Sequence, residues 1–353
     1  MVMHGLPLVG LGVMLAGLAG AGGTLLAVLA TVALPGAVVA AVHHAEVVAH
    51  RVGEPFGTLV LALAVTVIEV ALILSLMLTG TGGEQAALPR DTLFAAVMII
   101  ANGVVGLSLL MGGLVHGEQS FRVEGTGSGL AALVGLSTLV LVLPTFTTSS
   151  PEGTYTTSQL VFTGSSSLAL WLVFVFFQTV RHRDYFLPAG DAPGIDHAPP
   201  PPPARAAASA GLLVLSLVAV VGLAKLLSPT IEALVAAAQA PRAAVGIVIA
   251  LMVLAPETWA ALRAARSNRL QTSMNLAFGS ALASIGLTVP VVVAASVWWQ
   301  LPLVLGLEAK DLVLLALTFV VCTITLGSGR TNLMQGAVHL VIFAAFLFLA
   351  LVP

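Results

Sequence analysis

Two glutamates interrupt long apolar stretches at matching positions. Glu69 ends the run Leu61–Glu69 (LALAVTVIE), and Glu257 ends the run Ile249–Glu257 (IALMVLAPE). A charged side chain at the bilayer centre costs at least about 2.5 kcal/mol, so each carboxylate must face protein or water and find a partner. We expect the pair to bind a cation or protons near the membrane midplane. The alternative is a pair of neutral glutamates hydrogen-bonded to the backbone.

Oxygen-bearing groups accompany the glutamates, and hard cations prefer oxygen ligands. Thr66 lies one turn before Glu69, whereas Pro256 lacks the N–H that would bond the carbonyl of Met252. The predicted cation- and proton-binding site, which is also the candidate metal site, therefore contains Glu69, Glu257, Thr66, Asn102, Asn275, Ser280 and Ser284. For the last four residues, hydrogen bonding between packed helices is an equally good explanation.

A second match follows each glutamate. The pattern N-x3-G-x6-G occurs twice, as Asn102, Gly106 and Gly113 and again as Asn275, Gly279 and Gly286. We expect the four glycines to permit close helix packing. Equivalent positions lie five membrane spans apart, and an odd number of spans inverts the second copy relative to the first. The sequence therefore predicts an inverted repeat, an arrangement that places a substrate site near the midplane.

The composition identifies the elements that must position these residues. The 353 residues are 58% hydrophobic and 8% charged, with a mean hydropathy of +1.08, whereas soluble domains are about 25% charged. A soluble enzyme is excluded, and the net charge of −2 offers no basic surface for nucleic acid. The chain is predicted to be an all-α polytopic membrane protein with about 11 transmembrane helices, at residues 6–22, 24–48, 56–79, 91–115, 128–146, 158–180, 209–228, 243–266, 272–298, 309–328 and 332–352.

These spans divide into four predicted parts. Residues 1–23 form an N-terminal transmembrane helix, residues 24–181 the first five-helix repeat, residues 182–208 a cytoplasmic Pro-rich loop, and residues 209–353 the second five-helix repeat. The run 6–42 is broken mainly by glycines, so it could instead hold one span and an interfacial piece.

Basic residues predict the orientation, because cytoplasmic loops carry excess Lys and Arg. Nine of them fall on the side of the N-terminus and four on the other: Arg51, Arg122, Arg181, Arg183, Arg205, Arg263, Arg266, Arg269 and Arg330, against Arg90, Lys225, Arg242 and Lys310. The N-terminus is therefore expected in the cytoplasm, and the C-terminus outside.

The sequence resembles the calcium/proton exchangers of the calcium/cation antiporter superfamily, and more narrowly the bacterial calcium-sodium/proton antiporters of the ChaA type. The resemblance lies in the two glutamate spans and in the stretches His43–Gly57, Asn275–Pro290 and Gly329–Asn332 with Gly336. It implies one first helix and two inverted five-helix halves in a bacterial inner membrane. It also implies exchange of cytoplasmic Ca²⁺ and/or Na⁺, with K⁺ as a further candidate, for external protons, and no cofactor besides these transported ions.

The sequence departs from the wider family beside both glutamates. Many relatives have Gly-Asn-Ala there, whereas this chain has Val65–Ile68 and Val253–Pro256. A glutamine that the family often places after the Gly-Ser pair is Ala283 here. These differences shift the expected substrate from calcium toward sodium or potassium.

Histidines provide candidates for proton relay or pH sensing, because imidazole titrates near neutral pH. His339 lies inside the last span, where a hydrogen bond between helices is the alternative. His43, Glu46 and His50 fall on one helical face, a spacing that could bind a metal or sense pH, although an interfacial polar cluster explains it as well.

Two other transport classes use the same carboxylates. Glutamates can line the pore of a cation channel, and an organic-cation transporter could pair them with an organic charge, although aromatic residues make up only 6% of the chain. The expected partners are inorganic cations, protons and the lipid bilayer, with no nucleic acid, and the sequence leaves open whether the chain forms a homo-oligomer.

Overall fold

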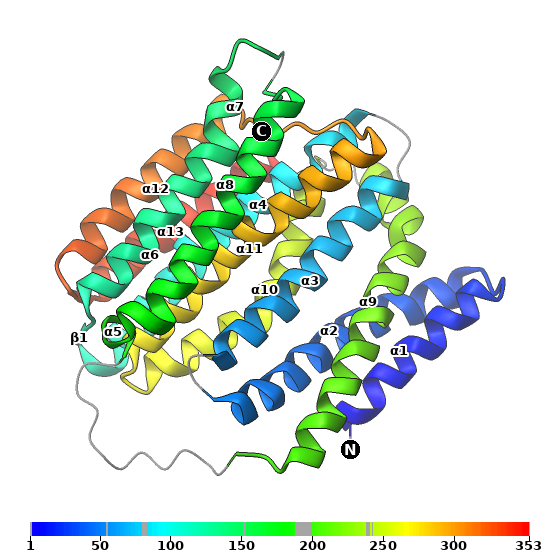
Figure 1. Ribbon diagram of the computed structural model, residues 1–353, viewed down its shortest axis with the longest axis horizontal. Helices are drawn as coiled ribbons and strands as arrows, with labels where there is room; N and C mark the ends of the chain where they lie inside the picture. The colour runs from blue at the N-terminus through cyan, green and yellow to red at the C-terminus, as the bar shows by residue number, and fades with distance from the viewer. Residues whose placement is uncertain are drawn as a thin grey trace. The chain divides into compact units, whose positions relative to one another are not determined.

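The computed structural model describes residues 2–53, 56–79, 83–150, 153–187, 200–237, 241 and 243–352. Internal contacts divide the chain into two compact units, each built from two separate stretches of sequence. Unit 1 consists of residues 1–85 and 194–242, and unit 2 of residues 86–193 and 243–353. The elements of both are labelled in Figure 1.

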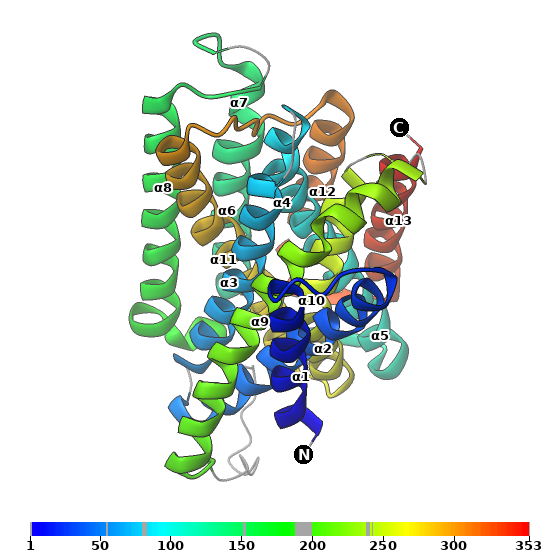
Figure 2. The same ribbon diagram turned by 90° about the vertical axis from the view of Figure 1, so that its right-hand side faces the viewer.

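Unit 1 is helical in its described part, with α1 (Val2–Leu18), α2 (Thr24–Val52), α3 (Phe56–Thr79) and α9 (Pro203–Ala237). Helix α2 packs against the other three helices, and Figure 2 shows α1, α2 and α9 close together. Small side chains make this packing close, because Ala37, Ala40 and Ala41 of α2 are fully buried. A break at Gly20 and Gly23, both at positive φ, separates α1 from α2. The apolar run 6–42 therefore contains most of α1 and the first part of α2.

Unit 2 contains the remaining helices and two short strands. After the 3₁₀ turn η1 (Gly83–Ala87), its first stretch contains α4 (Leu88–Met98), η2 (Ile99–Val104), α5 (Val105–His116), β1 (Glu118–Ser120), α6 (Val123–Ser137), η3 (Thr138–Val142), α7 (Leu143–Phe146), α8 (Thr157–Phe176), η4 (Phe177–Arg181) and η5 (Arg183–Phe186). Its second stretch contains α10 (Ala243–Arg266), α11 (Leu270–Trp299), α12 (Ala309–Gly327), β2 (Arg330–Asn332) and α13 (Leu333–Leu351).

Helix α11 lies in the core of unit 2, together with the more buried segment 85–116, and packs against α6, α8 and α10. Gly286 lets α8 approach, because a Cβ there would lie 2.5 Å from the Cβ of Trp171. The π-helical segments η2, η3 and η4 each continue a longer helix. β1 and β2 pair antiparallel, with Gln119 opposite Thr331, and connect the end of α5 to the start of α13.

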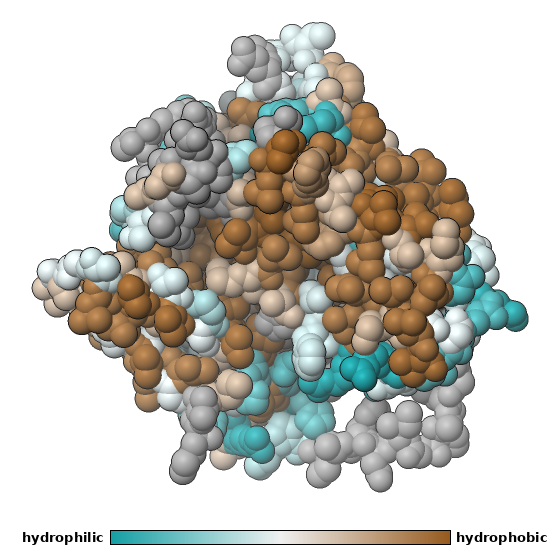
Figure 3. Space-filling model, turned by 180° about the vertical axis from the view of Figure 1, so that it is seen from behind, coloured by the Kyte–Doolittle hydropathy of each residue, from teal (hydrophilic) through white to brown (hydrophobic). Residues whose placement is uncertain are grey.

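Eight helices in the described residues are long and apolar enough to cross a membrane, and the bent helix α10 makes a ninth. The apolar stretches 3–18 and 62–78, in α1 and α3, are shorter. Each of the eleven predicted spans overlaps with one helix or with consecutive helical segments, whereas eleven crossings remain a prediction. Large apolar side chains such as Phe162, Val313 and Val341 are exposed, and hydrophobic surface covers much of the face in Figure 3. Such a surface suits contact with lipid.

The predicted Pro-rich loop is shorter than expected at its C-terminal end. Helix α9 begins at Pro203 instead of residue 209, because proline is tolerated in a first helical turn and six of the eight residues from 204 to 211 are Ala or Arg, which favour helix. At its other end, η5 already occupies residues 183–186. Residues 188–199 lie outside the described part of the chain. The division of the sequence into two five-helix repeats stays a prediction.

Candidate cation and proton site

Glu257 occupies the middle of α10, at a bend of 51° between the segments Gly246–Ala255 and Glu257–Arg266. Pro256 lies at this bend, and a proline inside a helix removes one backbone hydrogen bond. The Glu257 side chain is only 8% exposed. Ser280 of α11 donates its hydroxyl hydrogen to Glu257 Oε2 over 2.5 Å. The structure thus brings together two of the predicted ligands, from neighbouring helices of unit 2.

A small cavity of about 10 Å³ borders this pair, close to the space that one water molecule needs. Its walls come from η2, α10 and α11 and consist, besides Glu257 and Ser280, of Ile100, Val104, Leu254, Thr258, Leu276 and Ala277. Thr258 donates to the carbonyl of Leu254 over 2.7 Å. Glu257 therefore has a hydroxyl partner within otherwise mostly apolar surroundings.

Glu69 lies in unit 1, near the middle of α3, and its side chain is 4% exposed. Thr66, one turn earlier, is also buried and donates its hydroxyl hydrogen to the carbonyl of Ala62 over 2.8 Å. The oxygen of Thr66 keeps its lone pairs as acceptors. Both glutamates are thus buried carboxylates in the middle of apolar helices.

The Asn102 side chain makes contacts between helices of unit 2. Its Nδ2 donates to Thr318 Oγ1 over 2.8 Å, and its Oδ1 lies 3.1 Å from His339 Nδ1. The side chain therefore connects η2 to α12 and α13, while Ile100 and Val104 of the same segment line the Glu257 cavity. The helix-packing explanation applies here.

The Asn275 side chain also makes contacts between elements of unit 2. Its Nδ2 donates to the carbonyl of Phe186 over 2.6 Å, and its Oδ1 accepts from Gln271 over 2.9 Å. The residue thus ties the start of α11 to η5. Ser284, one turn beyond Ser280, is buried in α11.

The four glycines occupy two kinds of surroundings. A Cβ on Gly106, Gly113 or Gly286 would lie within 3.0 Å of His339, Leu333 or Trp171 respectively, so each permits a close approach. Gly279 differs, because a Cβ there would meet no described atom within 4 Å. The expected close contact is absent at Gly279, since it lies on a half-buried side of α11.

The histidines of α2 do not form the predicted set. His43 packs its ring edge against His44, 5.3 Å between centroids, whereas Glu46 and His50 are exposed. No group of three His, Cys, Asp or Glu side chains that could hold a metal occurs within the described ranges. The i, i+3 and i+7 spacing places these side chains on one helical face, where Glu46 and His50 are exposed. The described residues therefore give no support to metal binding by His43, Glu46 and His50, and pH sensing by them stays a prediction.

Three polar residues with buried contacts or cavity-lining positions were not predicted from the sequence. His44 is fully buried, lies 3.1 Å from the carbonyl of Met3 and stacks on the ring of His4. Thr258 lines the Glu257 cavity. Thr325 Oγ1 lies 3.1 Å from His339 Nε2. Thr258 follows Glu257 directly, so its position could have been noticed, but the other contacts join residues from different helices.

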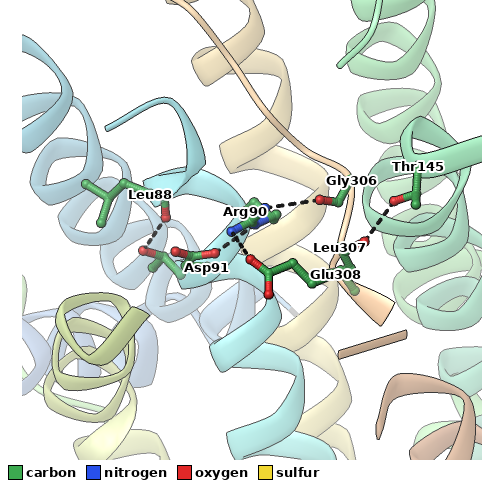
Figure 4. Close-up of polar contacts among 8 residues, drawn as sticks. Leu88, Arg90, Asp91, Thr145, Gly306, Leu307 and Glu308 are labelled. Carbon is green, nitrogen blue, oxygen red and sulfur yellow. Dashed lines mark hydrogen bonds and ion pairs between the residues drawn. The ribbon is translucent and has the colours of Figure 1, made fainter. Parts of the chain in front are cut away.

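A charged cluster outside the site fixes the N-terminal end of α4 (Figure 4). Arg90 pairs with Asp91 over 2.8 Å, donates to the carbonyl of Gly306 over 3.2 Å and lies 4.0 Å from a Glu308 oxygen. Thr145 donates to the carbonyl of Leu307 from the other side over 3.0 Å. These contacts attach the segment before α12 to α4 and α7.

The chain matches the family described as sodium/calcium exchanger protein over residues 22–180 and 208–352. The protein therefore belongs to that family of membrane cation antiporters. This result confirms the predicted resemblance, the all-helical polytopic class and the assignment as a transporter.

Individual relatives agree with this assignment. The chain is 52% identical over 323 residues to the putative ionic transporter y4hA of Sinorhizobium fredii, covering 91% of this chain and 87% of that protein. It is 38% identical over 309 residues to the sodium-potassium/proton antiporter ChaA of Escherichia coli, covering 87% and 83%. Among solved structures, native YfkE shares the fold with a TM-score of 0.75 at 16% identity, covering 99% of this chain and all of that one. The H⁺/Ca²⁺ exchanger CAX has a TM-score of 0.69 at 15% identity, covering 98% and 87%.

Proposed function

We propose that the protein exchanges a cytoplasmic cation, Na⁺ in the first place, for external protons, and that Glu69 and Glu257 bind both kinds of ion. The observation that carries this proposal is the Glu257 carboxylate, buried at the bend of an apolar helix beside Ser280 and a small cavity. Membership of an antiporter family and the similarity to a sodium-potassium/proton antiporter support it.

Exchange follows from competition for the same carboxylates. A cation binds the ionised glutamates, whereas protonation neutralises them and removes the attraction. Protons that enter from outside therefore release the cation there, and proton loss to the cytoplasm prepares the site for the next cation. Ser280 suits both states, because its hydroxyl donates to an ionised carboxylate and can accept from a protonated one.

Similarity to a sodium-potassium/proton antiporter favours a monovalent ion over calcium. Calcium takes six to eight oxygen ligands, and the side chains of Asn102 and Asn275 make contacts between elements of unit 2. Ser280 and Thr258 supply hydroxyl oxygens beside Glu257. We therefore propose Na⁺, followed by K⁺, as the preferred substrate, with Ca²⁺ as the competing one.

We also propose the membrane arrangement expected from the loops, with two inverted five-helix repeats in a bacterial inner membrane and the N-terminus in the cytoplasm. Single cysteines placed at Glu118 and Gln300, in a Cys322→Ala background, test the orientation with a membrane-impermeant thiol reagent. Labelling at residue 300 alone in intact cells agrees with the proposal. Labelling at residue 118 alone would show the opposite orientation.

The function is tested with purified protein in proteoliposomes that carry a pH gradient and a fluorescent pH indicator. Na⁺, K⁺, Ca²⁺ and Mg²⁺ are added separately at pH 7 to 9. We expect Na⁺ to dissipate the gradient at the lowest concentration, followed by K⁺. Dissipation by Ca²⁺ alone would overturn the proposed selectivity, and a response to none of the ions by inserted protein would overturn cation/proton exchange.

The channel and organic-cation alternatives predict different results in the same proteoliposomes. A channel gives Na⁺ current without a pH gradient, whereas an antiporter moves Na⁺ only against protons or another Na⁺. An organic-cation transporter responds to a quaternary amine and to none of the four metal ions.

A further inference from the structure

The π-helical segment η2 forms part of the wall of the Glu257 cavity, through Ile100 and Val104. Asn102 lies between them in sequence and contacts α12 and α13. One short segment therefore has a side toward the carboxylate and a side toward two other helices of unit 2. π-Helical turns inside α-helices occur frequently at functional sites.

The hydrogen bonds of Asn102 fix the orientation of its amide. Thr318 Oγ1 lies 2.7 Å from the carbonyl of Leu314 and 3.4 Å from Met98 Sδ, so its hydroxyl hydrogen points to one of these two acceptors. The Thr318 oxygen then accepts from Asn102 Nδ2, and Asn102 Oδ1 faces His339. Because this oxygen only accepts, His339 Nδ1 carries a hydrogen.

The second ring nitrogen completes the network. Thr325 Oγ1 lies 3.1 Å from His339 Nε2 and donates to it when the imidazole is neutral. The groups around the ring are all neutral, namely Asn102 with the Ala101 backbone on η2 and Thr325 on α12. Cys322, whose sulfur lies 4.0 Å from the carbonyl of Ala101, is buried. No carboxylate among the described contacts is available to pair with an imidazolium. The geometry therefore suits a neutral histidine that holds helices together.

Close packing makes the position of η2 depend on these contacts. A Cβ on Gly106 would lie 2.9 Å from the Cβ of His339, and a Cβ on Gly103 would lie 3.3 Å from the ring of Phe343. Helix α13 therefore lies directly on η2 and α5, with the hydrogen bonds at the contact. Ile100 and Val104 belong to the same π-helical segment as Asn102, so a shift of η2 would move both of these cavity-lining residues.

We propose that Thr318, Asn102, His339 and Thr325 are positioning residues that hold η2 against the Glu257 site and thereby set its affinity for the transported cation. The proposal rests on Glu257 being an exchange site. It assigns His339 to positioning instead of proton relay.

The test uses Thr325→Val, which removes the donor to His339 at nearly constant volume, and Thr318→Val, which removes the acceptor of Asn102. Thr323→Val is the matched control, because Thr323 belongs to the same helix, is exposed and bonds only the carbonyl of Phe319 among described atoms. Thr325→Ser should restore the donor. Glu257→Gln is included to test the underlying function separately.

Apparent KM for Na⁺, maximal rate and the pH of half-maximal exchange are measured in proteoliposomes with matched protein content. Loss of one hydrogen bond predicts an apparent KM about 3- to 10-fold higher for Thr325→Val and Thr318→Val. Because protons then compete more effectively, half-maximal exchange at fixed Na⁺ should move to higher pH, with little change in the maximal rate. Thr325→Ser and Thr323→Val should resemble the wild type.

Two results would overturn the positioning role. One is a wild-type KM and pH profile in both valine variants while Glu257→Gln abolishes exchange. The other is loss of proton movement in Thr325→Val with Na⁺/Na⁺ exchange retained, because this would identify a proton relay. Retained proton-coupled exchange in Glu257→Gln overturns the function of the site, whatever the threonine variants show.

Discussion

Glu69 and Glu257 occupy equivalent positions in a repeated sequence, but their surroundings differ. Glu257 lies at a helix bend of 51° and receives a hydroxyl from Ser280 on the neighbouring helix. On the helix of Glu69, Thr66 lies one turn earlier, and its hydroxyl hydrogen is bonded to the carbonyl of Ala62. If the two glutamates bind the cation as proposed, Ser280 adds a hydroxyl from an adjacent helix beside Glu257, and Thr66 adds one from the preceding turn beside Glu69.

The largest expected effect comes from removing the carboxylate, which both positions share. Glutamine has nearly the shape of glutamate but neither carries a charge nor titrates, so Glu69→Gln and Glu257→Gln should each reduce Na⁺/H⁺ exchange by about 100-fold or more. Dissipation of the pH gradient in everted vesicles measures this. Glu124→Gln, at an exposed glutamate of α6, is the control. Full activity in only one of the two variants would mean that the copies do not contribute equally.

The next effect tests the contribution of the neighbouring helix. Ser280→Ala removes a hydrogen bond to a charged group, which predicts an apparent KM for Na⁺ about 10- to 100-fold higher. Ser165→Ala, at an exposed serine of α8 that bonds the carbonyl of Val161, should leave KM unchanged. An unchanged KM in Ser280→Ala would show that the hydroxyl serves packing alone.

The smallest effect concerns the first copy. Thr66→Val should raise the apparent KM for Na⁺ by less than about 3-fold, because the threonine hydrogen is already bonded to a backbone carbonyl. Na⁺ titrations of Thr66→Val and Thr66→Ser measure the difference. An effect in Thr66→Val as large as in Ser280→Ala would remove the proposed distinction between the copies.

Much of the fold was predictable, because burial of apolar helices in lipid leaves a direct signal in the sequence. Each predicted span overlaps with helical structure, and the glycines that separate α1 from α2 could be identified in the sequence. The start of α9 was misplaced because residues 203–208 contain small residues that form helix without being strongly apolar. The length of an apolar run therefore predicts spans better than it predicts where helices end.

The site was predictable only in part. Glu257 and Ser280, both in the predicted set, belong to adjacent helices and form a hydrogen bond, whereas cation binding by them stays a prediction. Asn102 bonds Thr318 and His339, which are 216 and 237 residues away in sequence. A single sequence identifies a buried asparagine as polar but does not reveal which distant helix satisfies it. Ligand and packing roles were therefore indistinguishable before the contacts were known.

The most direct test of the two-glutamate account is proton release when Na⁺ is added to purified protein in weakly buffered detergent solution at pH 8. If cation and protons compete for Glu69 and Glu257, the wild type should release protons in a saturable manner, and K⁺ should do the same at higher concentration. The double variant Glu69→Gln/Glu257→Gln, shown to be folded, should release none. Proton release equal to that of the wild type from this double variant would contradict the account.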